Sequence, residues 1–290
     1  MFKMEDSKHL SEAENWTEVI EPHSSLLSLN LKEVWRYRDL LLLLVKRDFV
    51  TYFKQTILGP IWFFVNPIFT TIMYTFVFGN LAGLSTDGAP QVAFYLSGIV
   101  MWNYFSNSLN QTANVFTTNA NIFGKVYFPR LIMPLAVVTS NLMQFAIQFL
   151  LFIAVVIYYS YIGKLHPNLW VLMTPILIVL MAGFALGLGM IFSSMTTKYK
   201  DMTMLLTFGV QLFMYATPVI YPVSAMNEKY RDIILLNPLT AIIECFRYGF
   251  LGVGDFNSGM LIYSIVFISI MLIIGTLVFN KVQKSFMDTI

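Results

Sequence analysis

Two oppositely charged side chains stand three residues apart in an apolar stretch, and they are the first residues here that could do chemistry. Glu244 and Arg247 lie within LLNPLTAIIECFRYGFLGVG, residues 235–254. On a helix, residues at i and i+3 share a face. In a medium of low dielectric constant, a carboxylate and a guanidinium so placed satisfy each other. We therefore favour a structural ion pair over a catalytic or substrate-binding role.

The common enzyme signatures are absent from the sequence. It contains no G-x-x-x-x-G-K-[ST] phosphate loop, no H-E-x-x-H zinc motif and no G-x-S-x-G nucleophile motif. The three histidines are isolated, and the single cysteine, Cys245, has no companion for a disulfide or a metal site. We expect no catalytic residue and no metal or cofactor bound by this chain.

The elements that position Glu244 and Arg247 are hydrophobic. Of the 290 residues, 57% are hydrophobic and 12% are charged, against roughly 25% charged in soluble proteins. Six windows contain no Asp, Glu, Lys or Arg, and each is long enough to cross a bilayer, which takes about 20 residues. The sequence predicts an all-α integral membrane protein with six transmembrane helices. Their approximate ranges are 61–81, 92–116, 134–162, 170–192, 203–221 and 260–280.

The second of these ranges is polar on one side. Asn103, Asn107 and either Asn110 or Gln111 recur at near-helical spacing. Polar groups without partners are costly in the hydrocarbon core, so we expect this face to contact protein or water rather than lipid.

The positive charges orient the chain. Eight Lys and Arg residues lie in residues 1–60, and further pairs follow the second, fourth and sixth expected helices, whereas the other set of loops holds four. Because positive residues favour the cytoplasmic side, both termini are expected inside. Residues 1–30 are polar and acidic and predict a flexible cytoplasmic tail, which leaves 31–290 as the membrane domain.

Three segments are not simple crossings. Residues 31–59 predict an amphipathic helix in the membrane interface. The link 117–134 has more bulky apolar residues than an exposed loop needs, so we expect it to dock onto another surface or to pack back on the interface. Residues 222–259, on the outside, are apolar but interrupted, and they predict a re-entrant pair of short helices between the fifth and sixth crossings.

The expected crossings carry no interior charge. Ion-coupled carriers usually place an ionisable group at mid-membrane, where it binds the coupling ion. Energy for transport would therefore come from another polypeptide.

Four stretches carry a resemblance to a known family. They are LVKRDFVTYFKQTILGPIWFFVNPIF (44–69), GKVYFPRLIMPLA (124–136), KYKDM (198–202) and EKYRDIILLNPLTAIIECFRYGFLG (228–252). In order and spacing they resemble the permease subunits of ABC-2-type polysaccharide exporters. These proteins move lipid-linked O-antigen, teichoic acid or capsular polymer across the bacterial plasma membrane. The resemblance covers about residues 30–284.

The resemblance implies a non-catalytic permease in the bacterial inner membrane, working as a homodimer with two copies of a separate ATPase that binds ATP and Mg²⁺. It implies contacts with membrane lipids and a lipid-linked glycan, and none with nucleic acid. Residues 44–58 would form a gate helix, whose candidate residues are Arg47, Phe49, Tyr52 and Phe53. The first cytoplasmic loop would be a coupling helix seated on the ATPase, with candidates Asn119, Ile122, Phe123, Lys125, Tyr127 and Phe128. The segment 222–254 would shape the exit.

Aromatic residues are abundant, with 26 Phe, 15 Tyr and 5 Trp. Their faces offer surfaces on which sugar rings could stack and slide, and conduction needs contacts that are weak and repeated. The same residues also fill cores and form interfacial belts. The candidate channel-lining residues in the first crossing are Trp62, Phe63, Asn66 and Tyr74.

Other functions stay open on the sequence alone. Within transport, the cargo could be teichoic acid, capsule, a drug or a small lipid rather than O-antigen. A membrane enzyme acting on polyprenyl lipids would need paired acids to hold a metal and a phosphate, and Asp39, Asp48 and Asp201 form no such cluster in the sequence. A scaffold without transport activity is the third class.

Overall fold

The computed structural model describes residues 31–54, 59–123, 128–254 and 256–285, and within these ranges the chain is helical, with no strand. The helices are α1 (Leu31–Arg36), α2 (Arg38–Lys54), α3 (Trp62–Tyr74), α4 (Gln91–Ala113), α5 (Val115–Thr118), α6 (Ala120–Phe123), α7 (Ile132–Tyr161), α8 (Thr174–Thr196), α9 (Asp201–Tyr215), α10 (Glu228–Leu235), α11 (Pro238–Leu251) and α12 (Ser258–Ser285). A π-helical stretch, Thr75–Leu81, continues α3, and a 3₁₀ turn, Leu169–Met173, precedes α8.

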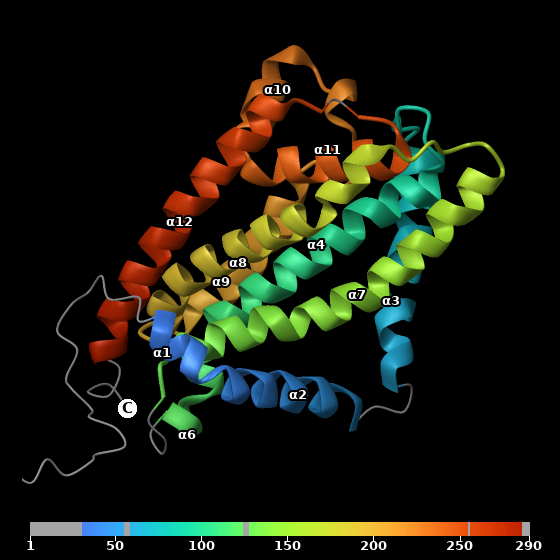
Figure 1. Cartoon of the computed structure of the whole chain (residues 1–290). Coiled ribbons are helices and arrows are strands. Elements are labelled where there is room, and N and C mark those ends of the chain that lie inside the picture. Colours follow the sequence, from blue (N-terminus) through green and yellow to red (C-terminus); the bar gives the residue numbers. More distant parts are fainter. Residues whose placement is uncertain (1–30, 55–58, 124–127, 255, 286–290) are drawn as a thin grey trace, which may run out of the picture.

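The long helices form one tilted bundle with short helices at its two ends (Figure 1). The end that carries α1, α2 and α6 is called the α2 end below, and the end that carries α10 is called the α10 end. Four described segments are long and apolar enough to cross a bilayer, and they match four of the six expected ranges. They are Trp62–Leu81, Ile132–Tyr161, Leu169–Thr196 and Ser258–Val282.

The other two expected crossings differ from the long apolar type. α4 has 23 residues but carries the asparagines noted above, and 16 of its side chains are buried among other helices (Ala93 to Met101, Trp102, Tyr104, Phe105, Ser108, Leu109, Thr112 and Ala113). α9 has 15 residues and ends at Tyr215, where the sequence predicted residue 221. At 1.5 Å per residue it is about 22 Å long, short of the ~30 Å hydrocarbon core.

Glycines let α8 pack closely on its two main neighbours. A Cβ built on Gly187 would lie 2.9 Å from the Met271 carbonyl oxygen of α12, and Gly275 of α12 faces Gly187 in turn. On another side of α8, a Cβ on Gly189 would lie 2.6 Å from Thr112 of α4. Small residues at helix contacts bring backbones together where lipid supplies no hydrophobic driving force.

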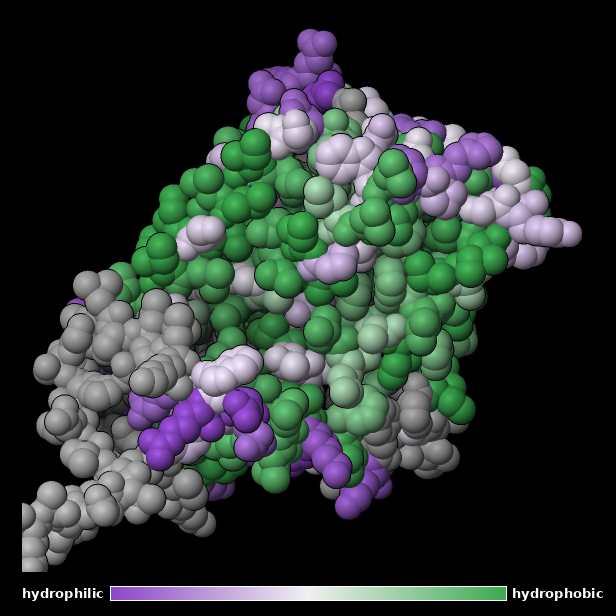
Figure 2. All heavy atoms as spheres, viewed as in Figure 1, coloured by the Kyte–Doolittle hydropathy of each residue, from purple (hydrophilic) through white to green (hydrophobic). Residues whose placement is uncertain are grey.

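The outer surface of the bundle is apolar between two polar ends. Figure 2 shows hydrophobic residues over its middle and hydrophilic residues gathered near α10 and near α2. Large apolar side chains point outward from α3, α7, α8, α9 and α12, for example Phe69, Leu150, Val179, Phe208 and Ile262, each 60% exposed or more. A continuous apolar belt of this kind is a surface for lipid.

The packing of α8 on α12 gives the first testable expectation. Gly187→Ala places a methyl group against the α12 backbone, and overpacking of this kind costs about 1–3 kcal/mol. We expect a lower melting temperature in detergent, measured by fluorescence-detected size exclusion. Gly209→Ala on α9 is the matched control, because its Cβ meets nothing within 4 Å and Ala favours a helix over Gly. A Gly187→Ala protein that melts at or above the unsubstituted protein would contradict the close approach.

Candidate functional site

The α10 end contains a helical hairpin whose turn is set by its sequence. α10 and α11 meet at a bend of 99°. The Oδ1 atom of Asn237 accepts the N–H of Leu239 at 3.0 Å, and Pro238, which has no N–H, takes the first helical position. α11 ends where Gly252, at a φ of 71°, donates its N–H to the Tyr248 carbonyl oxygen at 3.2 Å.

Asn237 also ties this hairpin to the end of α9. Its Nδ2 atom donates to the Ala216 carbonyl oxygen at 2.9 Å and to the Thr217 hydroxyl at 2.8 Å. One carboxamide therefore caps α11 and satisfies backbone groups released where α9 stops. The C-terminal end of α9 and the start of α11 therefore form one hydrogen-bonded junction.

α11 is buried on all sides along nearly its whole length, although it is amphipathic in sequence. Its aromatic residues pack on α7: the rings of Phe246 and Phe250 each lie 5.2 Å from the ring of Phe152. On the α12 side, the Ser264 hydroxyl donates to the Pro238 carbonyl oxygen at 2.8 Å. α11 is thus held inside the bundle rather than laid on its surface, whereas α10 has no buried residue.

Arg247 of α11 is the most constrained side chain of the hairpin, with 1% of its surface exposed. Its guanidinium donates to the carbonyl oxygens of Pro218 (2.6 Å) and Val219 (2.7 Å), just after α9, and to the Ser97 hydroxyl of α4 (3.3 Å). It also lies 3.7 Å from the centre of the Phe94 ring. A buried cation is tolerated only with such partners. The network joins α11, α4 and the segment that follows α9.

Two glycines make room for the ion pair. The Nη1 atom of Arg247 lies 3.5 Å from Oε1 of Glu244, which is 3% exposed. A Cβ on Gly98 of α4 would lie 2.8 Å from Nη2 of Arg247 and 2.7 Å from the Val219 carbonyl oxygen, and a Cβ on Gly254 would lie 2.8 Å from Oε2 of Glu244. Among the described residues both side chains are almost fully enclosed, at 1% and 3% exposed, which fits a structural role.

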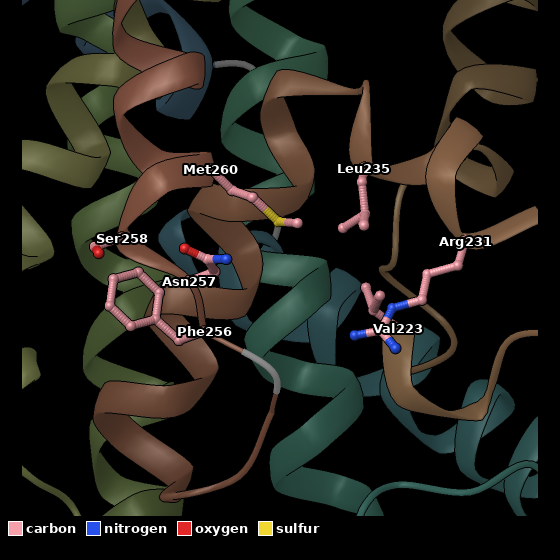
Figure 3. Close-up of a pocket in the computed structure, with 7 residues that line it drawn as sticks. All are labelled: Val223, Arg231, Leu235, Phe256, Asn257, Ser258 and Met260. Carbon is pink, nitrogen blue, oxygen red and sulfur yellow. The ribbon is translucent and has the colours of Figure 1, made fainter. Parts of the chain in front are cut away.

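A pocket of about 330 Å³ opens beside the hairpin at the α10 end. Figure 3 shows Arg231 of α10 and Val223 on one side of it, and Phe256, Asn257 and Met260, at the start of α12, on the other. A guanidinium, an amide and an aromatic ring are groups that contact hydroxylated or anionic ligands.

At the α2 end, two of the predicted coupling residues are buried within the chain itself. Phe123 is 4% and Phe128 is 5% exposed, and their rings stack at 5.7 Å. The ring of Phe116 lies 5.4 Å from Phe123 and stacks on Phe279 of α12 at 4.8 Å. Part of the link therefore packs back on the membrane domain. Among its described residues, 117–123 and 128–134, the exposed side chains are those of Thr117, Thr118 and Asn121. Asn119 and Ile122 are half-buried, and Lys125 and Tyr127 lie outside the described residues.

The predicted interfacial helix consists of α1 and α2, separated by Tyr37. α2 buries Leu44 and Val45 in the same cluster as Phe116 and Phe123, against α7. Of the gate-helix candidates, Phe49 is half-buried and Arg47 pairs with its neighbour Asp48 at 2.7 Å. The side chains of Tyr52 and Phe53 lie outside the described part of the chain.

The four channel-lining candidates on α3 do not share one environment. Trp62 is 46% exposed and Asn66 is exposed, Tyr74 is half-buried, and Phe63 is 4% exposed. The Tyr74 hydroxyl donates to the Met214 sulfur of α9 at 3.5 Å. Phe63 therefore packs inside this chain, whereas Trp62 and Asn66 face outward.

Sequence reasoning missed the partners of Arg247 on α4. Ser97 and Gly98 stand between large side chains in FYLSGIVMW, residues 94–102, and this pair of small residues was the available signal for a close contact. Two amides on α7, Asn141 and Gln148, were also missed. They are seven residues apart in an apolar segment, a spacing that places both on one helix face.

Four long apolar helices, together with a buried helix, α11, that carries an ion pair, define a polytopic integral membrane protein. This chain belongs to the ABC-2 type transporter family, whose model matches residues 39–251. It is 29% identical over 265 residues to the O-antigen export system permease protein RfbA of Klebsiella pneumoniae. The aligned region covers 90% of this chain and 99% of that protein. A second protein of that name from Klebsiella pneumoniae is 28% identical over 253 residues, 86% of this chain and 94% of that protein. The protein of that name from Myxococcus xanthus is 26% identical over 219 residues. The aligned region covers 75% of this chain and 82% of that protein.

The Arg247 network gives the second expectation. Arg247→Met leaves Glu244 and the two carbonyl oxygens without the guanidinium, and breaking a buried pair in this way costs about 3–5 kcal/mol. We expect a large loss of melting temperature in detergent. Adding Glu244→Gln should recover part of it, because the uncompensated carboxylate is then removed.

Arg38→Met is the matched control. Arg38 pairs with Asp39 at 3.9 Å, with side chains 59% and 87% exposed, and an exposed pair contributes about 1 kcal/mol or less. Equal effects of Arg38→Met and Arg247→Met would contradict a structural role for the buried pair.

Proposed function

We propose that this chain is the transmembrane permease subunit of an ATP-driven exporter that moves a lipid-linked polysaccharide, O-antigen, across the inner membrane of a bacterium. The observation that carries this proposal is the match, over 90% of the chain, to a protein named as an O-antigen export permease. The chain acts as a homodimer with two copies of a separate ATPase, which binds ATP and Mg²⁺. No catalytic step is assigned to the permease.

The proposed topology has six crossings, with the α2 end in the cytoplasm. α4 and α9 supply the two crossings that are not long apolar helices. Lys46, Arg47 and Lys54 of α2 lie at the α2 end, which supports its cytoplasmic placement. The tail, residues 1–30, then lies in the cytoplasm, and the α10–α11 hairpin is re-entrant from the outer side.

The ATPase docks on the α2 end. Because Phe123 and Phe128 are buried, they anchor the link to the membrane domain rather than touching a partner. The partner surface is the exposed side of the link, at Thr117, Thr118 and Asn121. Lys125 and Tyr127, which follow it, remain candidates for the same surface.

An ATPase bound to the link at the α2 end would move a segment that packs on several helices at once. The cluster beneath the link includes Leu44 of α2, Ile132 of α7, Met190 of α8 and Phe279 of α12. Well-packed side chains transmit displacement because interiors have low compressibility. A movement of the ATPase is thereby shared between α2, the gate helix, and three of the long helices.

The third expectation tests the permease assignment and the docking surface together. Tagged chain is co-expressed with the ABC ATPase encoded beside its gene, purified in detergent and assayed for ATP hydrolysis in nanodiscs. We expect a complex of two permeases and two ATPases. Asn121→Arg places a long cation in the centre of the proposed interface and should lower co-purification by at least about tenfold, or 1.4 kcal/mol.

Two control variants separate the possible failures. Asn80→Arg changes an exposed asparagine near the opposite end of α3 and should leave the complex intact. Phe123→Ala should lower the melting temperature by removing a buried ring. If no ATPase binds the unsubstituted chain, the permease proposal is wrong. If the ATPase binds and Asn121→Arg has no effect, only the docking surface is wrong.

A further inference from the structure

A row of carboxamides runs along one side of α4. Asn103, Asn107 and Asn110, followed by Asn114 at the C-cap of the helix, stand at i, i+4, i+7 and i+11. This spacing places all four on one face, and at 1.5 Å per residue they span about 16 Å. Each is half-buried. We call these four residues the carboxamide row.

The two ends of the row are bonded to two different helices. At one end, Nδ2 of Asn103 donates to Oε1 of Gln148 on α7 at 3.3 Å. At the other end, the Thr203 hydroxyl of α9 donates to Oδ1 of Asn114 at 2.9 Å. A different side of α4 packs on α8, where the rings of Phe105 and Phe184 stack at 5.4 Å. The row is therefore the side of α4 that its neighbours border without covering it.

Two members of the row have no side-chain hydrogen-bond partner in the described part of the chain. Asn107 and Asn110 are half-buried and make no side-chain hydrogen bond there, and Oδ1 of Asn110 itself is buried. Polar groups left unpaired in a membrane protein are costly, so a partner that reaches the exposed part of these side chains would stabilise them.

We propose that the carboxamide row binds hydroxyl groups of the translocating sugar chain, as one wall of its path through the membrane. This inference rests on the proposed export function. Lipid tails cannot supply the missing partners, because they neither donate nor accept hydrogen bonds. Sugar hydroxyls do both, and so do carboxamides.

The chemistry of the row fits an uncharged polymer that has to move. α4 contains no Asp, Glu, Lys or Arg, so no ion pair can hold the cargo in place. Asn103 and Asn114 are held by bonds to α7, α9 and the Asn110 carbonyl oxygen, which leaves Asn107 and Asn110 to exchange hydrogen bonds with a moving chain. Conduction needs contacts weak enough to be exchanged. The outward-facing aromatic residue Trp62 stays a separate candidate for a surface on which sugar rings stack.

Thiol labelling tests whether the row faces water. Cys245 is the single cysteine of the sequence and is fully buried, so the native background is low. Asn107→Cys and Asn110→Cys, each in the permease–ATPase complex in nanodiscs, are exposed to a charged, membrane-impermeant methanethiosulfonate. We expect labelling at least tenfold faster than at Leu150→Cys, an outward position on α7 that is 66% exposed.

Labelling no faster than at Leu150→Cys would overturn the proposal, because lipid or a second copy would then cover the row. Oxidative cross-linking separates these two cases, since a second copy seated there would give a disulfide-linked dimer of the Asn107→Cys chain.

Export by cells that depend on the variant chain is the second readout. We expect the double variant Asn107→Leu/Asn110→Leu, which keeps side-chain size and removes the amides, to co-purify with the ATPase and to lower surface polysaccharide at least tenfold. Ser108→Ala, which changes a buried residue on the same helix outside the row, should export normally. Normal export by the double variant would refute the sugar-binding role. Absence of export by the unsubstituted chain would instead refute the export function.

Discussion

The burial of one guanidinium shapes the α10 end of the molecule. Arg247 is charged and almost fully enclosed, so every donor it carries has to find an acceptor. Two acceptors are the carbonyl oxygens of Pro218 and Val219, which lie beyond the end of α9 at Tyr215 and outside any helix. This requirement links α11, the segment after α9 and the glycine on α4, which all meet at the guanidinium.

The same requirement explains how short elements can lie among membrane helices. Backbone that is not helical is tolerated at membrane depth only where protein satisfies its polar groups. Arg247 satisfies two such groups, and Asn237 satisfies Ala216 as well as the start of α11. The break after α9 and the 99° bend before α11 are therefore stabilised by each other's side chains rather than by water.

The sequence alone was sufficient to predict those transmembrane helices that are long, uncharged and apolar. Uncharged windows predicted Trp62–Leu81, Ile132–Tyr161, Leu169–Thr196 and Ser258–Val282, because length and hydrophobicity decide whether a segment can span. The end of α9 was placed too late because the apolar run continues beyond Tyr215. Pro218 was the available signal, since it has no N–H for the Met214 carbonyl and disfavours a helical residue before it. The burial of Phe123 could not be predicted either. An aromatic residue in a loop is equally compatible with docking to a partner and with anchoring the loop to its own chain.

α12 connects the two ends that the proposed mechanism has to couple. Near one end its Ser264 hydroxyl bonds the first carbonyl of α11, and toward the other its Phe279 ring stacks on Phe116 in the cluster beneath the link. Between these points it lies against α8 at glycine contacts that leave little freedom to slide sideways. A displacement of the link can therefore reach the hairpin through one continuous helix. Under the proposed function, the exit would respond to the ATPase without any ionisable group inside the long apolar crossings.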